Sequence, residues 1–100
     1  DLERDLDEVL AETEAAIVAR ETGLDRGSCD KLVQVAHRAR ALKGHGLEEG
    51  ISTRLLVYSG SLIGGGIGAR DACRMALSRP ITDDGDIRST LDHAIDMVFD

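Results

Sequence analysis

Residues 48–62 read Glu-Glu-Gly-Ile-Ser-Thr-Arg-Leu-Leu-Val-Tyr-Ser-Gly-Ser-Leu, and this stretch predicts both a helix and a site at its start. Ser52 and Thr53 are good helix N-cap residues, and an apolar run follows them. Arg54 would then lie in the first helical turn, where the macrodipole disfavours a cation by roughly 0.3–1 kcal/mol. A bound anion would reverse this penalty, because free N–H groups, the dipole and the guanidinium would all converge on it.

Arg54 also allows a plainer interpretation. An exposed arginine at a helix start can pair with nearby carboxylates, here Glu48 or Glu49. The residues alone do not choose between this ion pair and an anion site.

Apolar residues recur with helical spacing along the rest of the chain. The pattern predicts helices over residues 3–21, 27–42, 53–63, 69–78 and 87–99. Only Tyr58 and Phe99 are aromatic, so the core must be built from Leu, Ile, Val and Ala, which disfavours a β-sandwich. The expected fold is an all-α bundle of about five helices, forming one small domain over residues 1–100 with short connections.

Residues that start or stop helices mark the expected boundaries. Gly23 is placed to end the first helix, and Ser28 is placed to cap the second. Gly64-Gly65-Gly66 ends the third, and Pro80 closes the fourth. The last helix has three candidate caps: Asp83, Asp84 and Asp86.

The apolar stripes define a candidate core. In the first helix, the residues with helical spacing are Leu2, Leu6, Val9, Leu10, Ala16 and Ile17. The later stripes add Val35, Ala39, Leu42, Ala72, Cys73, Ala76, Ala94, Val98 and Phe99. We expect one core to contain Leu32, Val33, Ala36, Leu55, Leu56, Leu77, Leu91 and Ile95.

The formal charge of −7 argues against general nucleic-acid affinity. The charge is uneven, since residues 1–14 carry seven acids and one Arg, whereas residues 20–54 carry seven bases and five acids. The densest basic cluster is His37, Arg38, Arg40 and Lys43. Two interpretations stay open for it: a solvated helix face, or a face that meets the acidic surface of a neighbouring subunit.

Cys29 and Cys73 are too few for a disulfide framework, and we expect free thiols in a reducing compartment, the cytoplasm. His93, Asp92 and Asp96 have helical spacing that would suit a metal, but a solvated helix face is the better interpretation, so no metal site is expected. No apolar run approaches ~18 residues, and no membrane span is expected. The chain has no signal-peptide pattern and does not begin with Met, which is compatible with a fragment of a larger protein.

From about Glu14 to the C-terminus, the chain resembles the lid of MoxR-type AAA+ ATPases, closest to their CbbQ/NirQ/NorQ branch. Five segments carry the resemblance: Ala-Leu-Lys-Gly at 41–44, Gly-Leu-Glu-Glu-Gly at 46–50, Ser-Thr-Arg-Leu-Leu-Val-Tyr at 52–58, Ala-Cys-Arg at 72–74 and Thr-Asp-Asp at 82–84. In that group, a sensor-2 arginine opens a helix of the C-terminal lid and reaches the phosphates of ATP. The resemblance thus implies that Arg54, with Ser52 and Thr53, contacts the nucleotide.

The resemblance further implies a ring-forming motor, commonly hexameric, that works with a von Willebrand A-domain protein. Such motors use ATP and Mg²⁺ to remodel or activate a client enzyme, which is rubisco in one line and nitric oxide reductase in another. The lid would close over ATP and transmit nucleotide state to the next subunit. Both clients remain open, because the two lines share these motifs.

The chain has no GxxxxGK[ST] motif, and the resemblance places the phosphate loop and the Mg²⁺ ligands in a preceding large domain. We therefore expect no catalytic residue in these 100 residues and no ATP hydrolysis by them alone. Gly64-Gly65-Gly66-Ile67-Gly68-Ala69 superficially fits a dinucleotide fingerprint, but a helix rather than a strand precedes it. The alternative function is a free-standing helical adaptor that binds a partner protein and has no nucleotide role.

Overall fold

The computed structural model describes residues 2–41, 51–81 and 84–99, and the prediction of an all-α fold is confirmed. No strand occurs within these ranges. The elements are α1 (Leu2–Thr22), α2 (Arg26–Arg40), α3 (Thr53–Gly64), α4 (Ala69–Cys73), the π-helical η1 (Arg74–Ser78), α5 (Arg79–Ile81) and α6 (Gly85–Val98). Because α4, η1 and α5 run into one another without a break, the described chain forms five helical segments.

Most of the predicted helix ends are confirmed. Gly23 ends α1 with a φ of 76°, and its N–H donates to the carbonyl of Ala19 at 2.8 Å. This backbone conformation is one that glycine adopts without steric cost. Gly66 ends the turn after α3 in a similar way, with a φ of 104°. Of the three candidate caps of the last helix, Asp84 is the N-cap, and its carboxylate accepts from the N–H groups of Asp86 and Ile87.

The prediction that Ser28 caps α2 is wrong. The N-cap is Asp25, whose carboxylate accepts from the Ser28 backbone N–H at 3.0 Å and from the Ser28 hydroxyl at 2.8 Å. Asp is at least as good an N-cap as Ser, and Ser28 lies three residues later, where its N–H needs an acceptor.

The prediction that Pro80 closes the fourth helix at Ser78 is also wrong, because helical structure continues to Ile81. Residues Arg74–Ser78 form a π turn, in which the N–H of Arg79 donates to the carbonyl of Arg74. Proline normally breaks a helix because its ring meets the carbonyl four residues back. A π turn shifts the carbonyl register by one residue and so relieves this clash.

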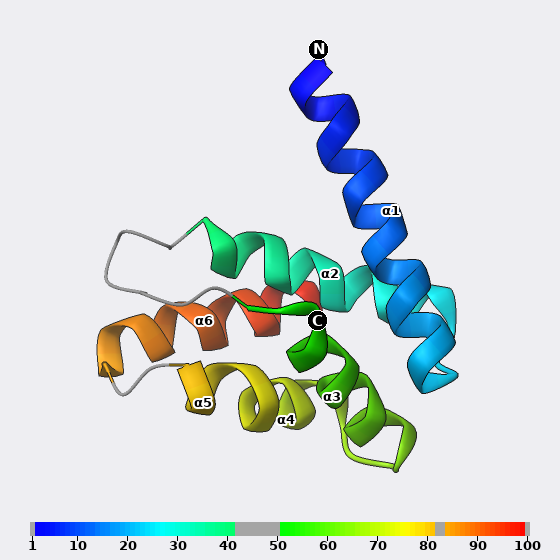
Figure 1. Ribbon diagram of the computed structural model, residues 1–100. Helices are drawn as coiled ribbons and strands as arrows, with labels where there is room; N and C mark the ends of the chain where they lie inside the picture. The colour runs from blue at the N-terminus through cyan, green and yellow to red at the C-terminus, as the bar shows by residue number, and fades with distance from the viewer. Residues whose placement is uncertain (1, 42–50, 82–83, 100) are drawn as a thin grey trace.

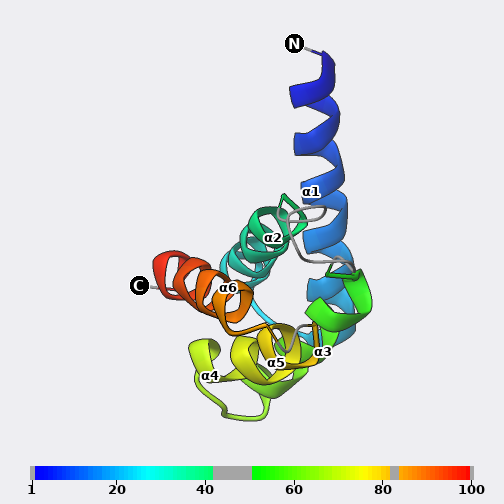
Figure 2. The same ribbon diagram turned by 90° about the vertical axis from the view of Figure 1, so that its left-hand side faces the viewer.

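The described helices share one core, and Figures 1 and 2 show how these helices are arranged. Helix α1 packs on α2 and α3, α2 packs on α6, and α3 packs on η1, while the N-terminal half of α1 extends clear of the other helices. Of the eight residues expected to share one core, all are buried except Leu55, which is partly buried. The core residues are Ala15, Val18, Cys29, Leu32, Val33, Val35, Ala36, Ala39, Ile51, Leu56, Cys73, Ala76, Leu77, Leu91 and Ile95.

The buried stripe of α1 differs from the apolar spacing in the sequence. Ala15 and Val18 are buried, whereas Val9, Leu10 and Ala16 are exposed. Val9 and Leu10 lie in the part of α1 that extends clear of the other helices, and Ala16 lies on the exposed side of the packed part. The side chains of Leu2 and Leu6, and all of Leu42, lie outside the part of the chain that can be described.

Candidate functional site at the start of α3

The predicted site residues Ser52, Thr53 and Arg54 lie together where α3 begins. The Ser52 hydroxyl accepts a hydrogen bond from the N–H of Leu55 at 3.3 Å, which makes Ser52 the N-cap, as predicted. Arg54 is exposed in the first turn, and no residue within 2–41, 51–81 or 84–99 pairs with its side chain. The alternative partners of Arg54, at positions 48 and 49, lie outside these ranges.

The first turn of α3 also presents backbone donors. The N–H groups of Leu55 and Leu56 bond to Ser52, whereas those of Thr53 and Arg54 have no acceptor among the described residues. Free donors at the positive end of a helix dipole favour a bound anion. This turn therefore combines an exposed arginine with backbone N–H groups that have no acceptor among the described residues, an arrangement that favours an anionic ligand.

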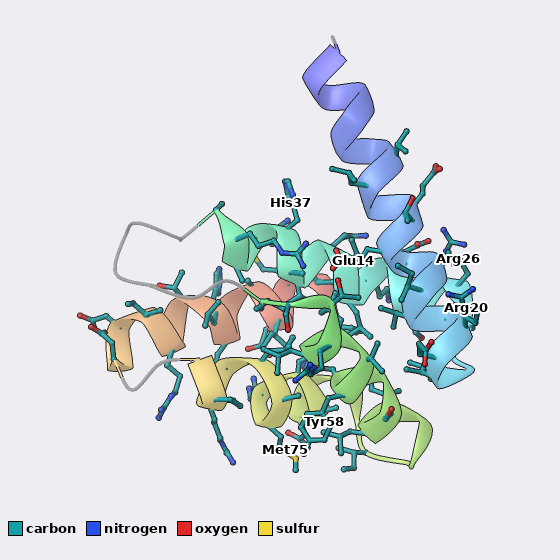
Figure 3. The ribbon with its side chains drawn as sticks, in the orientation of Figure 1. Glu14, Arg20, Arg26, His37, Tyr58 and Met75 are labelled. Atoms are coloured by element: carbon teal, nitrogen blue, oxygen red, sulfur yellow. The ribbon has the colours of Figure 1, made fainter. Side chains whose placement is uncertain are left out.

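Three helices meet directly beside this turn. The Arg40 guanidinium, at the end of α2, forms a two-bond pair with the Glu14 carboxylate of α1, at 2.8 and 2.7 Å. The same guanidinium donates to the carbonyl of Ile51 at 3.0 and 2.8 Å. The Thr53 hydroxyl donates to Glu14 at 2.6 Å. We call Glu14, Arg40, Thr53 and the Ile51 carbonyl the junction cluster; Figure 3 shows Glu14 where α1 crosses α2, close to the start of α3.

Burial and charge pairing make the junction cluster more than a surface ion pair. The Glu14 side chain is only 12% exposed. Its hydrogen bond from Arg40 holds the pKa of the Glu14 carboxyl below the ordinary value, and this effect outweighs the opposing desolvation. The same hydrogen bond raises the pKa of Arg40. Glu14 is therefore ionised at neutral pH, and its charge is compensated by Arg40.

The sequence does not predict the junction cluster. Arg40 was expected in a basic surface cluster that is either solvated or faces another subunit, whereas its guanidinium binds Glu14 and Ile51 of the same chain. The sequence gives little indication of these contacts, because Glu14 and Thr53 are 26 and 13 positions away from Arg40. Of the other cluster members, His37 and Arg38 are exposed, and Lys43 is outside the described residues.

The carboxylates considered as metal ligands have a different role. Asp96 accepts a hydrogen bond from Arg74 at 2.7 Å, and Asp92 lies 3.8 Å from the same guanidinium. These ion pairs connect η1 to α6. Among the described residues, no group of three or more His, Cys, Asp or Glu side chains could hold a metal ion. No helix found there is long and apolar enough to cross a membrane.

Both cysteines are free and buried in the core. Burial raises the pKa of Cys73 to about 12. Burial also raises the pKa of Cys29, and the nearby Asp25 and Asp30 carboxylates add to this effect. A thiol with a raised pKa is a poor nucleophile, so Cys29 and Cys73 act as core residues, as predicted for Cys73.

A shallow groove lies between α2 and α6, with a volume of about 180 Å³, and it is lined by Arg38, Thr90, Leu91, His93, Ala94 and Met97. Ligand pockets usually enclose about 300–1,000 Å³. This groove is therefore too small to enclose a nucleotide.

The C-terminal family shared by CbbQ, NirQ and NorQ proteins (CbbQ/NirQ/NorQ C-terminal) matches residues 14–98 of this chain. The match begins at Glu14 of the junction cluster and includes the whole of α3. This chain belongs to the CbbQ/NirQ/NorQ C-terminal family. The resemblance noted from the five sequence segments is thereby confirmed.

Three relatives extend this finding. Protein CbbQ of Hydrogenophilus thermoluteolus is 57% identical over 95 residues, which is 95% of this chain and 36% of that protein. Protein NorQ of Paracoccus denitrificans is 47% identical over 78 residues, or 78% of this chain and 29% of NorQ. The denitrification regulatory protein NirQ of Pseudomonas aeruginosa is 45% identical over 74 residues, or 74% of this chain and 28% of NirQ. The chain thus spans about a third of the length of these curated relatives.

Proposed function

We propose that this domain is the lid of a MoxR-type AAA+ ATPase, in which Arg54 acts as the sensor-2 arginine. In this proposal the remaining length of the protein supplies the phosphate loop and the Mg²⁺ ligands. The lid closes over ATP and transmits nucleotide state to the neighbouring subunits of a ring. The motor works with a von Willebrand A-domain protein on a client enzyme, either rubisco or a nitric oxide reductase.

The placement of Arg54 carries this proposal. Its side chain is exposed, in the first turn of a well-capped helix, beside the N–H groups of Thr53 and Arg54, for which the described ranges hold no acceptor. A cation there is unfavourable without an anion, and a triphosphate is the anion that a lid meets when it closes. The planar guanidinium can bind phosphate oxygens in a bidentate manner and stabilise charge that develops during phosphoryl transfer.

The test is Arg54→Ala in the ATPase that carries this domain. We expect ATP hydrolysis to fall by roughly tenfold or more, equivalent to about 1.4 kcal/mol in the barrier. Arg54→Lys should restore part of the rate, because Lys keeps the charge but loses the planar fork. Arg20→Ala is the matched control, since Arg20 is an exposed arginine at the end of α1.

Thermal unfolding of the 100-residue chain completes this test. Because Arg54 points into solvent, Arg54→Ala should leave the melting temperature unchanged. Normal hydrolysis and normal ATP affinity in Arg54→Ala would refute the sensor-2 role. The adaptor function would then be the remaining explanation of the domain.

A further inference from the structure

We propose that the junction cluster positions Arg54 for its ligand, with Glu14, Arg40 and Thr53 acting as positioning residues. This inference rests on the proposed sensor-2 role of Arg54. It goes beyond that role because it assigns a function to three side chains on three different helices. None of these side chains is proposed to bind the phosphates, since the Thr53 hydroxyl is bonded to Glu14 and only the Thr53 backbone N–H belongs to the proposed anion site.

The junction cluster holds the chain on both sides of the residue that caps α3. Ile51 and Thr53 flank the N-cap Ser52, and both are bonded into the cluster. The backbone entering α3 is therefore attached to α2 through the Ile51 carbonyl and to α1 through the Thr53 hydroxyl. Arg54 is the next residue, so the direction in which its side chain leaves the helix follows from these two attachments.

The hydrogen bonds of the junction cluster fix the orientation of its groups as well as their distances. Glu14 and Arg40 form a bidentate pair, and the guanidinium makes two further bonds to the Ile51 carbonyl. Bidentate pairing fixes the relative orientation of both groups as well as their distance. Ile51 itself is only 2% exposed, so its side chain anchors the same backbone in the core. A first helical turn held in this way has little freedom to reorient.

The charges of the junction cluster are compatible with an anion bound at the first turn of α3. Glu14 accepts a hydrogen bond from the residue directly before Arg54, so its negative charge lies beside the turn that would receive phosphate oxygens. An unpaired carboxylate in this position would repel a phosphate. Arg40 compensates that charge, and the cluster can therefore fix the turn without opposing the anion.

The experiment is a double-mutant cycle in the ATPase that carries this domain, with ATP affinity measured by titration. We expect Arg54→Ala to weaken ATP binding roughly tenfold and Glu14→Gln to weaken it at least about threefold, because small misplacements of a contacting group are costly. In the Arg54→Ala background, Glu14→Gln should have no further effect. Glu12→Gln removes the same charge from an exposed neighbour on α1, and it should leave the affinity unchanged.

Two outcomes would overturn the inference in different ways. If Glu14→Gln weakens ATP binding equally with and without Arg54, Glu14 acts by another route, and only the positioning role fails. If Arg54→Ala itself has no effect, the sensor-2 role fails, and the positioning role fails with it.

A second pair of variants covers the case in which Glu14→Gln does not fold. Thr53→Val replaces the hydroxyl that donates to Glu14 by a methyl group of similar size, and Thr53→Ser keeps that donor. We expect Thr53→Val to weaken ATP binding, whereas Thr53→Ser should bind ATP about as well as the unsubstituted protein. Amide hydrogen exchange at Leu55 and Leu56 should be faster in Thr53→Val, because their N–H groups report directly on the first turn. Unchanged exchange and unchanged affinity in Thr53→Val would contradict the proposal.

Discussion

At the scale of single residues, Glu14 links the pH dependence of stability to the junction cluster. Its pKa in the folded chain is lowered, chiefly by the hydrogen bond from Arg40. A carboxyl with a lowered folded-state pKa stabilises the fold above its unfolded pKa of about 4.3. That contribution is lost as the pH falls through the lowered folded-state value. Glu14 should thus matter at neutral pH and cease to matter in acid.

Urea unfolding of the 100-residue chain checks this prediction. At about pH 7, we expect Glu14→Gln to lower the free energy of unfolding by about 1–3 kcal/mol, the usual cost of a lost charged hydrogen bond. The difference from the unsubstituted chain should shrink as the pH falls below about 4. Glu12→Gln is the control and should have little effect at either pH, because Glu12 is exposed. A cost of Glu14→Gln that stays constant with pH would contradict this account.

The sequence predicts individual residues well where local chemistry determines them. Ser52 follows from its position before an apolar run, and so does the placement of Arg54 in a first turn. The partners of Arg40 were missed because they depend on how three helices meet. Asp25 is an intermediate case: the start of α2 was predicted to within two residues, but two polar residues three positions apart, Asp25 and Ser28, could each serve as its N-cap.

At the scale of helices, the contact between α1 and α3 depends on Gly60. A Cβ built at Gly60 would lie 2.8 Å from Cγ2 of Thr22, which is closer than two such atoms can approach. Thr22 cannot easily move away, since its hydroxyl donates to the carbonyl of Val18 and accepts from the N–H of Leu24. The close packing of the two helices therefore requires a residue without a side chain.

We expect Gly60→Ala to destabilise the 100-residue chain although alanine is the better helix former. The gain in propensity is about 1 kcal/mol, while overpacking of a core contact costs about 1–3 kcal/mol. Gly64→Ala is the matched control in the same helix, because its Cβ would meet only Leu24, at 3.9 Å. Thermal melts of the two variants should move in opposite directions, or Gly64→Ala should be neutral. A stabilised Gly60→Ala would show that α1 can shift away without cost.

The continuous helix formed by α4, η1 and α5 shows which features the apolar periodicity of the sequence predicts and which it does not. The apolar spacing correctly predicted that Ala72, Cys73, Ala76 and Leu77 are buried. It did not predict a π turn, because one extra residue in a turn leaves most of the stripe in place. The rule that proline ends a helix applies to α-helical geometry, and Pro80 follows a π turn instead.

At the scale of the whole molecule, side chains in the core contribute more to stability than side chains on the projecting N-terminal half of α1. Leu56 is fully buried on α3 with a relative exposure of 0%, whereas Leu10 is 64% exposed on α1. Both are leucines in predicted helices, and the apolar spacing of the sequence predicts that both are buried. The difference comes from the packing of the other helices against α3, which the order of apolar residues does not encode.

The substitutions Leu56→Ala and Leu10→Ala remove the same atoms from these two environments. Deleting a buried leucine side chain leaves a cavity and costs about 2–5 kcal/mol. Deleting an exposed one usually changes the free energy of unfolding by less than about 0.5 kcal/mol. Urea titrations of the 100-residue chain, compared at equal m-values, should therefore separate the two variants clearly. Comparable losses in both would mean that the N-terminal half of α1 is packed in solution, and that this chain associates through it.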